Sequence, residues 1–142
     1  MLPTSILVPV DFSSCSVRAL EYAAELARDR GATVHLLHAI GLDHSELRAT
    51  LTAEQIESLR IGAYAQLERI ATSRTGIMFG SLHVSLMDPR EAIIERATVL
   101  GVQLIAMGTH GRRGFRRFIL GSVTEYVVRH APCPILSIPE VP

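Results

Sequence analysis

The stretch Ser5-Ile-Leu-Val-Pro-Val10, which runs on into Asp11-Phe-Ser13, is the part of the sequence from which the fold can be worked out. Its apolar residues are consecutive rather than alternating, which is typical of a strand buried on both faces. Pro9 has no N–H to offer a neighbouring strand, so pairing is expected to stop near it. Ser13 or Ser14 can then cap a helix. A buried strand followed closely by a helix is the first unit of an α/β fold.

Four further apolar runs, rich in β-branched residues, follow the first one, and helical patterns separate them. They cover Thr33–Ala39, about Met78–Met87, Gln103–Met107 and Ile135–Ile138. This alternation predicts a doubly wound parallel sheet of five strands with helices on both faces. No repeat, linker or low-complexity segment interrupts it, so residues 1–142 are predicted to form a single domain. Ligands of such sheets bind at the carboxyl ends of the strands, where the strand order reverses.

The predicted helices carry start and stop signals. These are Thr52 with Gln55 as a capping box, Asp88 with Pro89 and Glu91, Ser122 with Glu125 as a second capping box, and the terminal glycines Gly31 and Gly101. The helix after Thr52 also has an apolar face at helical spacing. The residues that line this face are Ile56, Leu59, Ala63, Leu67 and Ile70.

The composition excludes several classes of protein. Fourteen basic residues balance fourteen acidic ones, so net charge favours neither nucleic acid nor an anionic membrane. All the basic residues are arginine. Without lysine the chain cannot be a Walker A NTPase, a protein kinase, a pyridoxal-phosphate enzyme or a Schiff-base aldolase. The absence also argues against a phosphoreceiver domain, although Asp11 ends a strand as a phosphoreceiver aspartate does.

The termini and cysteines indicate the compartment. Residues 1–5 lack the basic segment of a signal peptide, and no apolar run approaches the about 18 residues of a membrane span. Cys15 and Cys133 are far apart and suggest no disulfide framework. A soluble cytoplasmic protein with reduced thiols is therefore expected.

The segment from Gly108 to Ser122 joins the fourth strand to the last helix and carries three spaced glycines. Gly108 lets a ligand approach the strand exit, and Gly111 permits a turn with positive φ. Gly121 and Ser122 stand at a helix N-terminus, where free N–H groups and the helix dipole favour an anion. A phosphate-binding cradle is one interpretation. An ordinary strand-to-helix loop accounts for the same glycines on physical grounds alone.

The glycine spacing Gly108-x2-Gly111-x9-Gly121-Ser122 resembles the nucleotide-binding signature of the universal stress protein family, in its ATP-binding branch. The resemblance covers the whole chain. Ile6–Ser13 is similar to the family's first strand and acidic turn, Leu36–Ala39 to its second strand, and Arg129–Leu136 to its C-terminal signature. The chain departs from the family at Met87, where many members have glycine before the Asp88-Pro89 pair.

The resemblance implies a Rossmann-like fold of the adenine nucleotide alpha hydrolase type, with strand order 3-2-1-4-5. ATP, with or without Mg²⁺ or Mn²⁺, would lie across strands one and four. The implied nucleotide contacts are Pro9 and Val10 at the base, Asp11 at the ribose or a metal-bridged phosphate, Ala39 at adenine, Met107 and Gly108 at the nucleoside, and Gly111, Gly121, Ser122 and Val123 at the phosphates. His110 and Arg112 lie in the same loop and can meet a phosphate. No catalytic residue and no metal ligand set is assigned.

The function that the resemblance implies is that of a stress-response regulatory module. It would bind ATP, form a homodimer through Ile135–Ile138 and act on a regulatory protein partner. Two alternatives stay open, a slow ATPase or phosphate-transferring enzyme and a nucleotide-free interaction protein.

Two other features have competing interpretations. The run Arg112, Arg113, Arg116 and Arg117 can neutralise phosphates, be a solvated loop face, or bind nucleic acid, and zero net charge argues against the last. His35 and His38 are an odd number of residues apart on a strand, so they face opposite sides and cannot share a metal ion.

Overall fold

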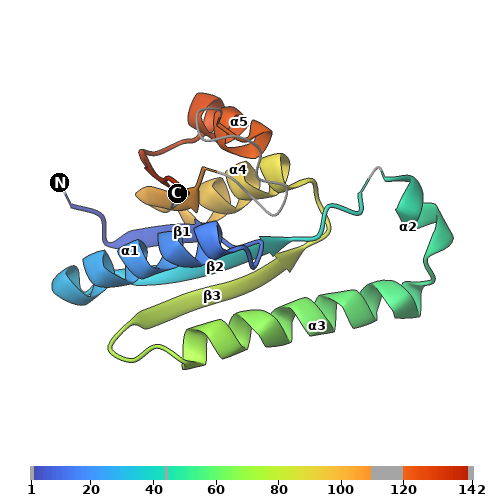
Figure 1. The fold of residues 1–142 in the computed structure, drawn as a ribbon, viewed down its shortest axis with the longest axis horizontal. Coiled ribbons are helices and arrows are strands. Elements are labelled where there is room, and N and C mark those ends of the chain that lie inside the picture. Colours follow the sequence, from blue (N-terminus) through green and yellow to red (C-terminus); the bar gives the residue numbers. More distant parts are fainter. Residues whose placement is uncertain (1, 44, 110–119, 141–142) are drawn as a thin grey trace.

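The first strand, β1 (Ser5–Pro9), lies at the centre of a parallel sheet, as Figure 1 shows. The structure is a computed structural model, and it describes residues 2–43, 45–109 and 120–140. The other strands are β2 (Thr33–Ala39), β3 (Met78–Ser85), β4 (Leu104–Gly108) and β5 (Ile135–Ile138). Their order is β3-β2-β1-β4-β5, and every neighbouring pair is parallel. The predicted five-stranded sheet and its order are confirmed.

Helices cover both faces of the sheet, as predicted. They are α1 (Ser14–Arg30), α2 (Glu46–Thr50), α3 (Ala53–Thr72), α4 (Pro89–Leu100) and α5 (Ser122–His130). One core cluster, with Leu20, Leu36 and Leu67, packs α1 and α3 against the sheet. The other, with Leu37 and Ile105, lies under α4 and α5. β1 supplies Ile6 to the first cluster and Leu7 to the second, because successive strand residues point to opposite faces.

The predicted helices and strands are present, but the structure differs from the prediction at four points. α2 was not predicted, since its five residues are too few to show a period and none of them is buried. β3 ends at Ser85 rather than Met87, and β4 ends at Gly108 rather than Met107. The capping box at Ser122 is wrong. Gly121 is the N-cap of α5 and no side chain caps it, while the Thr52–Gln55 box of α3 is present in full.

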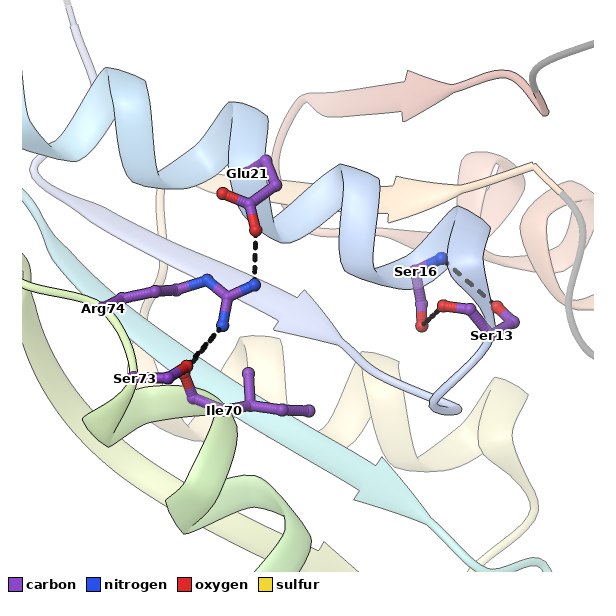
Figure 2. A network of polar contacts seen from close by, with 6 residues as sticks. All are labelled: Ser13, Ser16, Glu21, Ile70, Ser73 and Arg74. Carbon is purple, nitrogen blue, oxygen red and sulfur yellow. Dashed lines mark hydrogen bonds and ion pairs between the residues drawn. The ribbon is translucent and has the colours of Figure 1, made fainter.

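α1 and the C-terminal end of α3 are joined by an arginine (Figure 2). The guanidinium of Arg74 pairs with the Glu21 carboxylate on α1. Its other terminal nitrogen donates to the Ile70 carbonyl at 2.8 Å and to the Ser73 hydroxyl at 3.1 Å. One side chain therefore closes the end of α3 and ties it to α1 (Figure 2).

The N-terminal half of α3 extends past the sheet. Figure 1 shows α2 and the start of α3 beyond the arrowheads of β2 and β3. Accordingly Leu59 is 44% exposed and Ile61 is 62% exposed, whereas Leu67 in the second half is fully buried. Leu59 lies on the apolar face that the sequence predicts, but it stays exposed because the sheet does not reach it. Among the described residues, no helix combines the length and apolar character that crossing a bilayer requires.

Candidate functional site

The carboxyl ends of β1 and β4 are neighbours at the point where the strand order reverses. β1 leads through α1 to β2 on one side, and β4 leads through α5 to β5 on the other. In doubly wound sheets this switch point is where ligands bind. The structure places most of the predicted contacts around it: Pro9, Val10, Asp11, Met107, Gly108, Gly121, Ser122 and Val123, with Ala39 at the end of the adjoining β2.

Pro9 explains why β1 and β4 stop pairing. The N–H of Val10 donates to the Leu37 carbonyl on β2 at 2.7 Å. Because strand amides alternate in direction, the amide position of Pro9 faces β4, and proline has no hydrogen to donate there. β1 pairs with β2 up to Pro9, but its last pair with β4 is Leu7 with Ile105. The expectation that pairing ends near Pro9 is confirmed on the β4 side.

The turn from β1 to α1 is short and highly ordered by hydrogen bonds. Oδ1 of Asp11 accepts bonds from the Ser13 N–H, at 2.9 Å, and from the Ser13 hydroxyl. Ser13 in turn caps α1, with its hydroxyl accepting from the Ser16 N–H at 3.2 Å. Figure 2 shows this cap at the start of the helix. Asp11 therefore holds a fixed position at the carboxyl edge and is only partly buried.

Gly108 is needed for packing, a reason that the sequence did not reveal. A Cβ on Gly108 would lie 2.7 Å from Sγ of Cys15 and 3.0 Å from its carbonyl carbon, closer than real side chains approach. The first turn of α1 therefore rests directly on the end of β4. Cys15 is buried, and its thiol donates to the Ile138 carbonyl of β5 at 3.4 Å.

The start of α5 is attached to the end of β4. The N–H of Gly121 donates to the Thr109 carbonyl at 2.9 Å, and the Thr124 hydroxyl donates to the Gly108 carbonyl at 3.0 Å. Because of these bonds, α5 begins one residue earlier than predicted, with Gly121 rather than Ser122 at the N-cap. Ser122 is therefore exposed in the first turn instead of capping it. The first bond within the helix is made by the Glu125 N–H. The N–H groups of Ser122, Val123 and Thr124 are therefore those that α5 leaves for an anion.

Three side chains differ from their expected part in the site. Met107 and Val10 are buried in opposite core clusters, 4% and 3% exposed. Both can meet a ligand only through the main chain, and both main-chain hydrogen-bonding groups of Val10 are already used by β2. Met87 packs against the core under α4. The methionine side chain, at a position where many family members have glycine, therefore fills core space.

Part of the predicted site lies outside the described residues. This applies to His110, Gly111 and Arg112, and to Arg113, Arg116 and Arg117 of the basic run. Within the described ranges, no three His, Cys, Asp or Glu side chains gather in a way that could hold a metal ion. Asp88 caps α4 and accepts bonds from the Arg90 guanidinium, which lower the pKa of Asp88.

Sequence reasoning missed two groups that shape the site. His38 donates from Nδ1 to the Val10 carbonyl, and Thr124 holds α5 on β4. The histidine pair was correctly placed on different sides, since His38 packs on Phe12 of the first cluster, whereas His35 shares its side of β2 with Leu37 of the second. The part that His38 plays depends on the register that sets Leu37 beside Pro9, and no local pattern in the sequence carries that information.

The comparison with known proteins now gives the family. The profile of the universal stress protein family matches residues 4–139. The chain belongs to this family. The predicted resemblance is thereby confirmed, and the family is one of stress-response proteins.

Relatives and solved structures agree with this universal stress protein along nearly its whole length. Universal stress protein MJ0531 of Methanocaldococcus jannaschii is 28% identical in an alignment 140 residues long, which covers 94% of this chain and 80% of that one. MJ0577 of the same organism superposes with a TM-score of 0.88 at 27% identity, covering 100% of this chain and 99% of the other. A universal stress protein of Archaeoglobus fulgidus, solved in complex with dAMP, has a TM-score of 0.66 at 25% identity over 97% and 99%.

Proposed function

We propose that this universal stress protein binds an adenine nucleotide across the carboxyl ends of β1 and β4, and that ATP is the preferred nucleotide. The observation that carries the proposal is the start of α5. Three N–H groups without a partner in the helix and an exposed serine are fixed at the switch point by Thr109 and Thr124. This arrangement suits a phosphate group. The dAMP complex of the Archaeoglobus relative supports the choice of an adenine nucleotide.

The residues present fit such a ligand. Ser122 and Val123 would hold phosphate through their N–H groups, and the Ser122 hydroxyl adds a further donor. Asp11, fixed by Ser13, would accept from a ribose hydroxyl or meet a metal that bridges the phosphates. His110, Gly111, Arg112 and Gly121 complete the proposed phosphate end, and Pro9, Ala39, Met107 and Gly108 the nucleoside end. Mg²⁺ or Mn²⁺ would arrive with the nucleotide.

The biological role that we propose is regulatory. Nucleotide binding would act on the segment from Gly108 to Ser122 and change a surface that a protein partner reads. Rapid hydrolysis is not expected, because the carboxylate that the described residues bring to the switch point, Asp11, has an oxygen committed to Ser13. This proposed role is that of a soluble protein located in the cytoplasm.

A melting-shift assay tests the proposal. Purified protein is mixed with ATP, ADP, AMP or cyclic AMP, each with and without Mg²⁺ or Mn²⁺. At a ligand concentration about one hundred times Kd, binding adds about 2.7 kcal/mol, so ATP is expected to raise Tm by roughly 8 °C. Gly121→Val, whose side chain would crowd the phosphate end, is expected to lose the shift.

The matched control is Gly62→Val on α3, where a Cβ meets nothing within 4 Å. It is expected to keep the full nucleotide shift. An unchanged Tm of the wild-type protein with every nucleotide would favour an interaction protein that uses none. Turnover of ATP several times per minute, lost in Gly121→Val, would instead indicate an enzyme.

A further inference from the structure

The turn between β1 and α1 contains a strained residue. Phe12 has φ of +65°, and it is the one residue other than glycine with positive φ among those that the structure describes. A side chain in this region clashes with its own backbone, and such conformations persist only where the surroundings enforce them. The strain lies next to Asp11, in the segment assigned to the nucleotide. What enforces it therefore bears on the site.

His38 on β2 contacts the turn in two ways. Its Nδ1 lies 2.7 Å from the Val10 carbonyl oxygen, and since a carbonyl only accepts, Nδ1 carries the hydrogen. Its ring also packs on the ring of Phe12, with centroids 4.5 Å apart and planes tilted by 36°. The imidazole thus holds the residues on both sides of Asp11, one through a hydrogen bond and the other through a ring contact.

Phe12 also contacts the core and the neighbourhood of α3. Its ring packs against the core under α1 and α3, and it lines a surface pocket of about 230 Å³ with Gln66 and Ile70 of α3 and with Ser73, which follows the helix. The pocket leaves the ring room to move on this side, whereas the contact with His38 does not. Release of His38 would therefore allow Phe12 to leave the left-handed region and Asp11 to turn with it.

We propose that His38 is a positioning residue of the nucleotide site, which acts by holding Asp11 in place through Val10 and Phe12. The inference rests on the proposed function, because it concerns affinity for the same adenine nucleotide. It predicts that loss of His38 weakens nucleotide binding even at temperatures where the protein is fully folded. A histidine that only fills space would lower Tm and leave Kd unchanged.

Two substitutions separate the two contacts. His38→Asn keeps an N–H donor near the place of Nδ1 and removes the ring, while His38→Phe keeps a ring and removes the donor. The matched control is His35→Asn, on the same strand but facing β3, where it accepts from the Ser81 N–H at 2.9 Å. Kd for ATP with Mg²⁺ is measured by calorimetry at 10 °C, and Tm is measured without ligand.

We expect His38→Phe to weaken ATP binding at least tenfold and His38→Asn to recover most of that loss. His35→Asn is expected to lower Tm while its Kd stays within twofold of wild type. If both His38 variants bind ATP as the wild type does, the inference is overturned and the proposed function stands. If the wild-type protein itself binds no nucleotide, the proposed function fails, and the positioning role fails with it.

Discussion

A single histidine and a glycine define the irregular edge of the sheet. Val34 pairs with Phe79 and Leu36 pairs with Leu82, so Gly80 and Ser81 both stand opposite His35 in a β-bulge. A Cβ on Gly80 would lie 2.5 Å from the ring of His35 and 2.8 Å from the Thr33 methyl group. The bulge is therefore shaped around the imidazole.

Gly80→Ala is expected to destabilise the protein by about 1–3 kcal/mol, because the new methyl group overpacks the bulge. Urea unfolding against the wild type measures the loss, and Gly62→Ala on exposed α3 is the control. The His35→Ala background should reduce the effect, since the nearest contact is then gone. An equal loss in both backgrounds would contradict this origin of the strain.

The same histidine makes stability depend on pH. Burial lowers the pKa of His35 below its usual value, and burial, followed by the charge of Arg96, lowers that of His83. The Ser81 N–H donates to Nδ1 of His35, so protonation there would break a bond. Between the folded pKa and the unfolded value near 6.5, the unfolded chain binds more protons. Stability is therefore complete above the unfolded pKa and falls as pH drops below it.

Urea titrations at pH 7.5 and 5.5 should show this loss of free energy of unfolding. In His35→Gln the stability at pH 7.5 is expected to be lower, but its dependence on pH should be weaker than in the wild type. An unchanged slope in that variant would assign the pH effect to other groups.

At the scale of helices and strands, the sequence predicted what local chemistry decides. The Thr52–Gln55 cap, Asp88 before Pro89 and the ends at Gly31 and Gly101 depend on neighbours in the chain, and the structure has them all. The predicted cap at Ser122 failed because Thr109, distant in sequence, binds Gly121 instead. The extension of α3 beyond the sheet likewise depends on how the elements assemble, and the spacing of apolar residues along the helix does not predict it.

Substitution of Arg74, which joins α3 to α1, tests which of its contacts stabilises the packing of these two helices. Arg74→Ala is expected to cost about 1–3 kcal/mol, since it removes bonds to the Ile70 carbonyl and the Ser73 hydroxyl and leaves the end of α3 open. Glu21→Ala should cost under about 1 kcal/mol, because that carboxylate is half exposed. Chemical unfolding of both variants measures the difference. Equal losses would mean that the ion pair dominates.

At the scale of the whole molecule, the edge strand β5 bears on association between copies of the chain. β5 is an edge strand, and among the residues that the structure describes no strand lies beside its outward-facing amides. The Ile138 carbonyl accepts from the N–H of Thr109, the residue that follows β4, so the amide of its neighbour Ser137 points outward. We propose that two copies of the chain pair along this edge, as the sequence analysis expected.

Ser137→Pro is expected to convert the dimer to a monomer, because proline removes an outward N–H without touching the ladder to β4. Ser137→Ala keeps that N–H and should stay dimeric. Light scattering after size exclusion distinguishes the two. A wild-type protein that is monomeric at micromolar concentration, or a Ser137→Pro variant that remains dimeric, would contradict pairing through β5.

The overhang of α3 has a consequence for how this protein can change over evolutionary time. Its exposed first half, with Leu59 and Ile61, supports neither core cluster. Lengthening, shortening or recomposing that half would leave Pro9, Asp11 and the start of α5 where they are. The switch point and the overhang can therefore diverge independently, one keeping a ligand while the other acquires new surroundings.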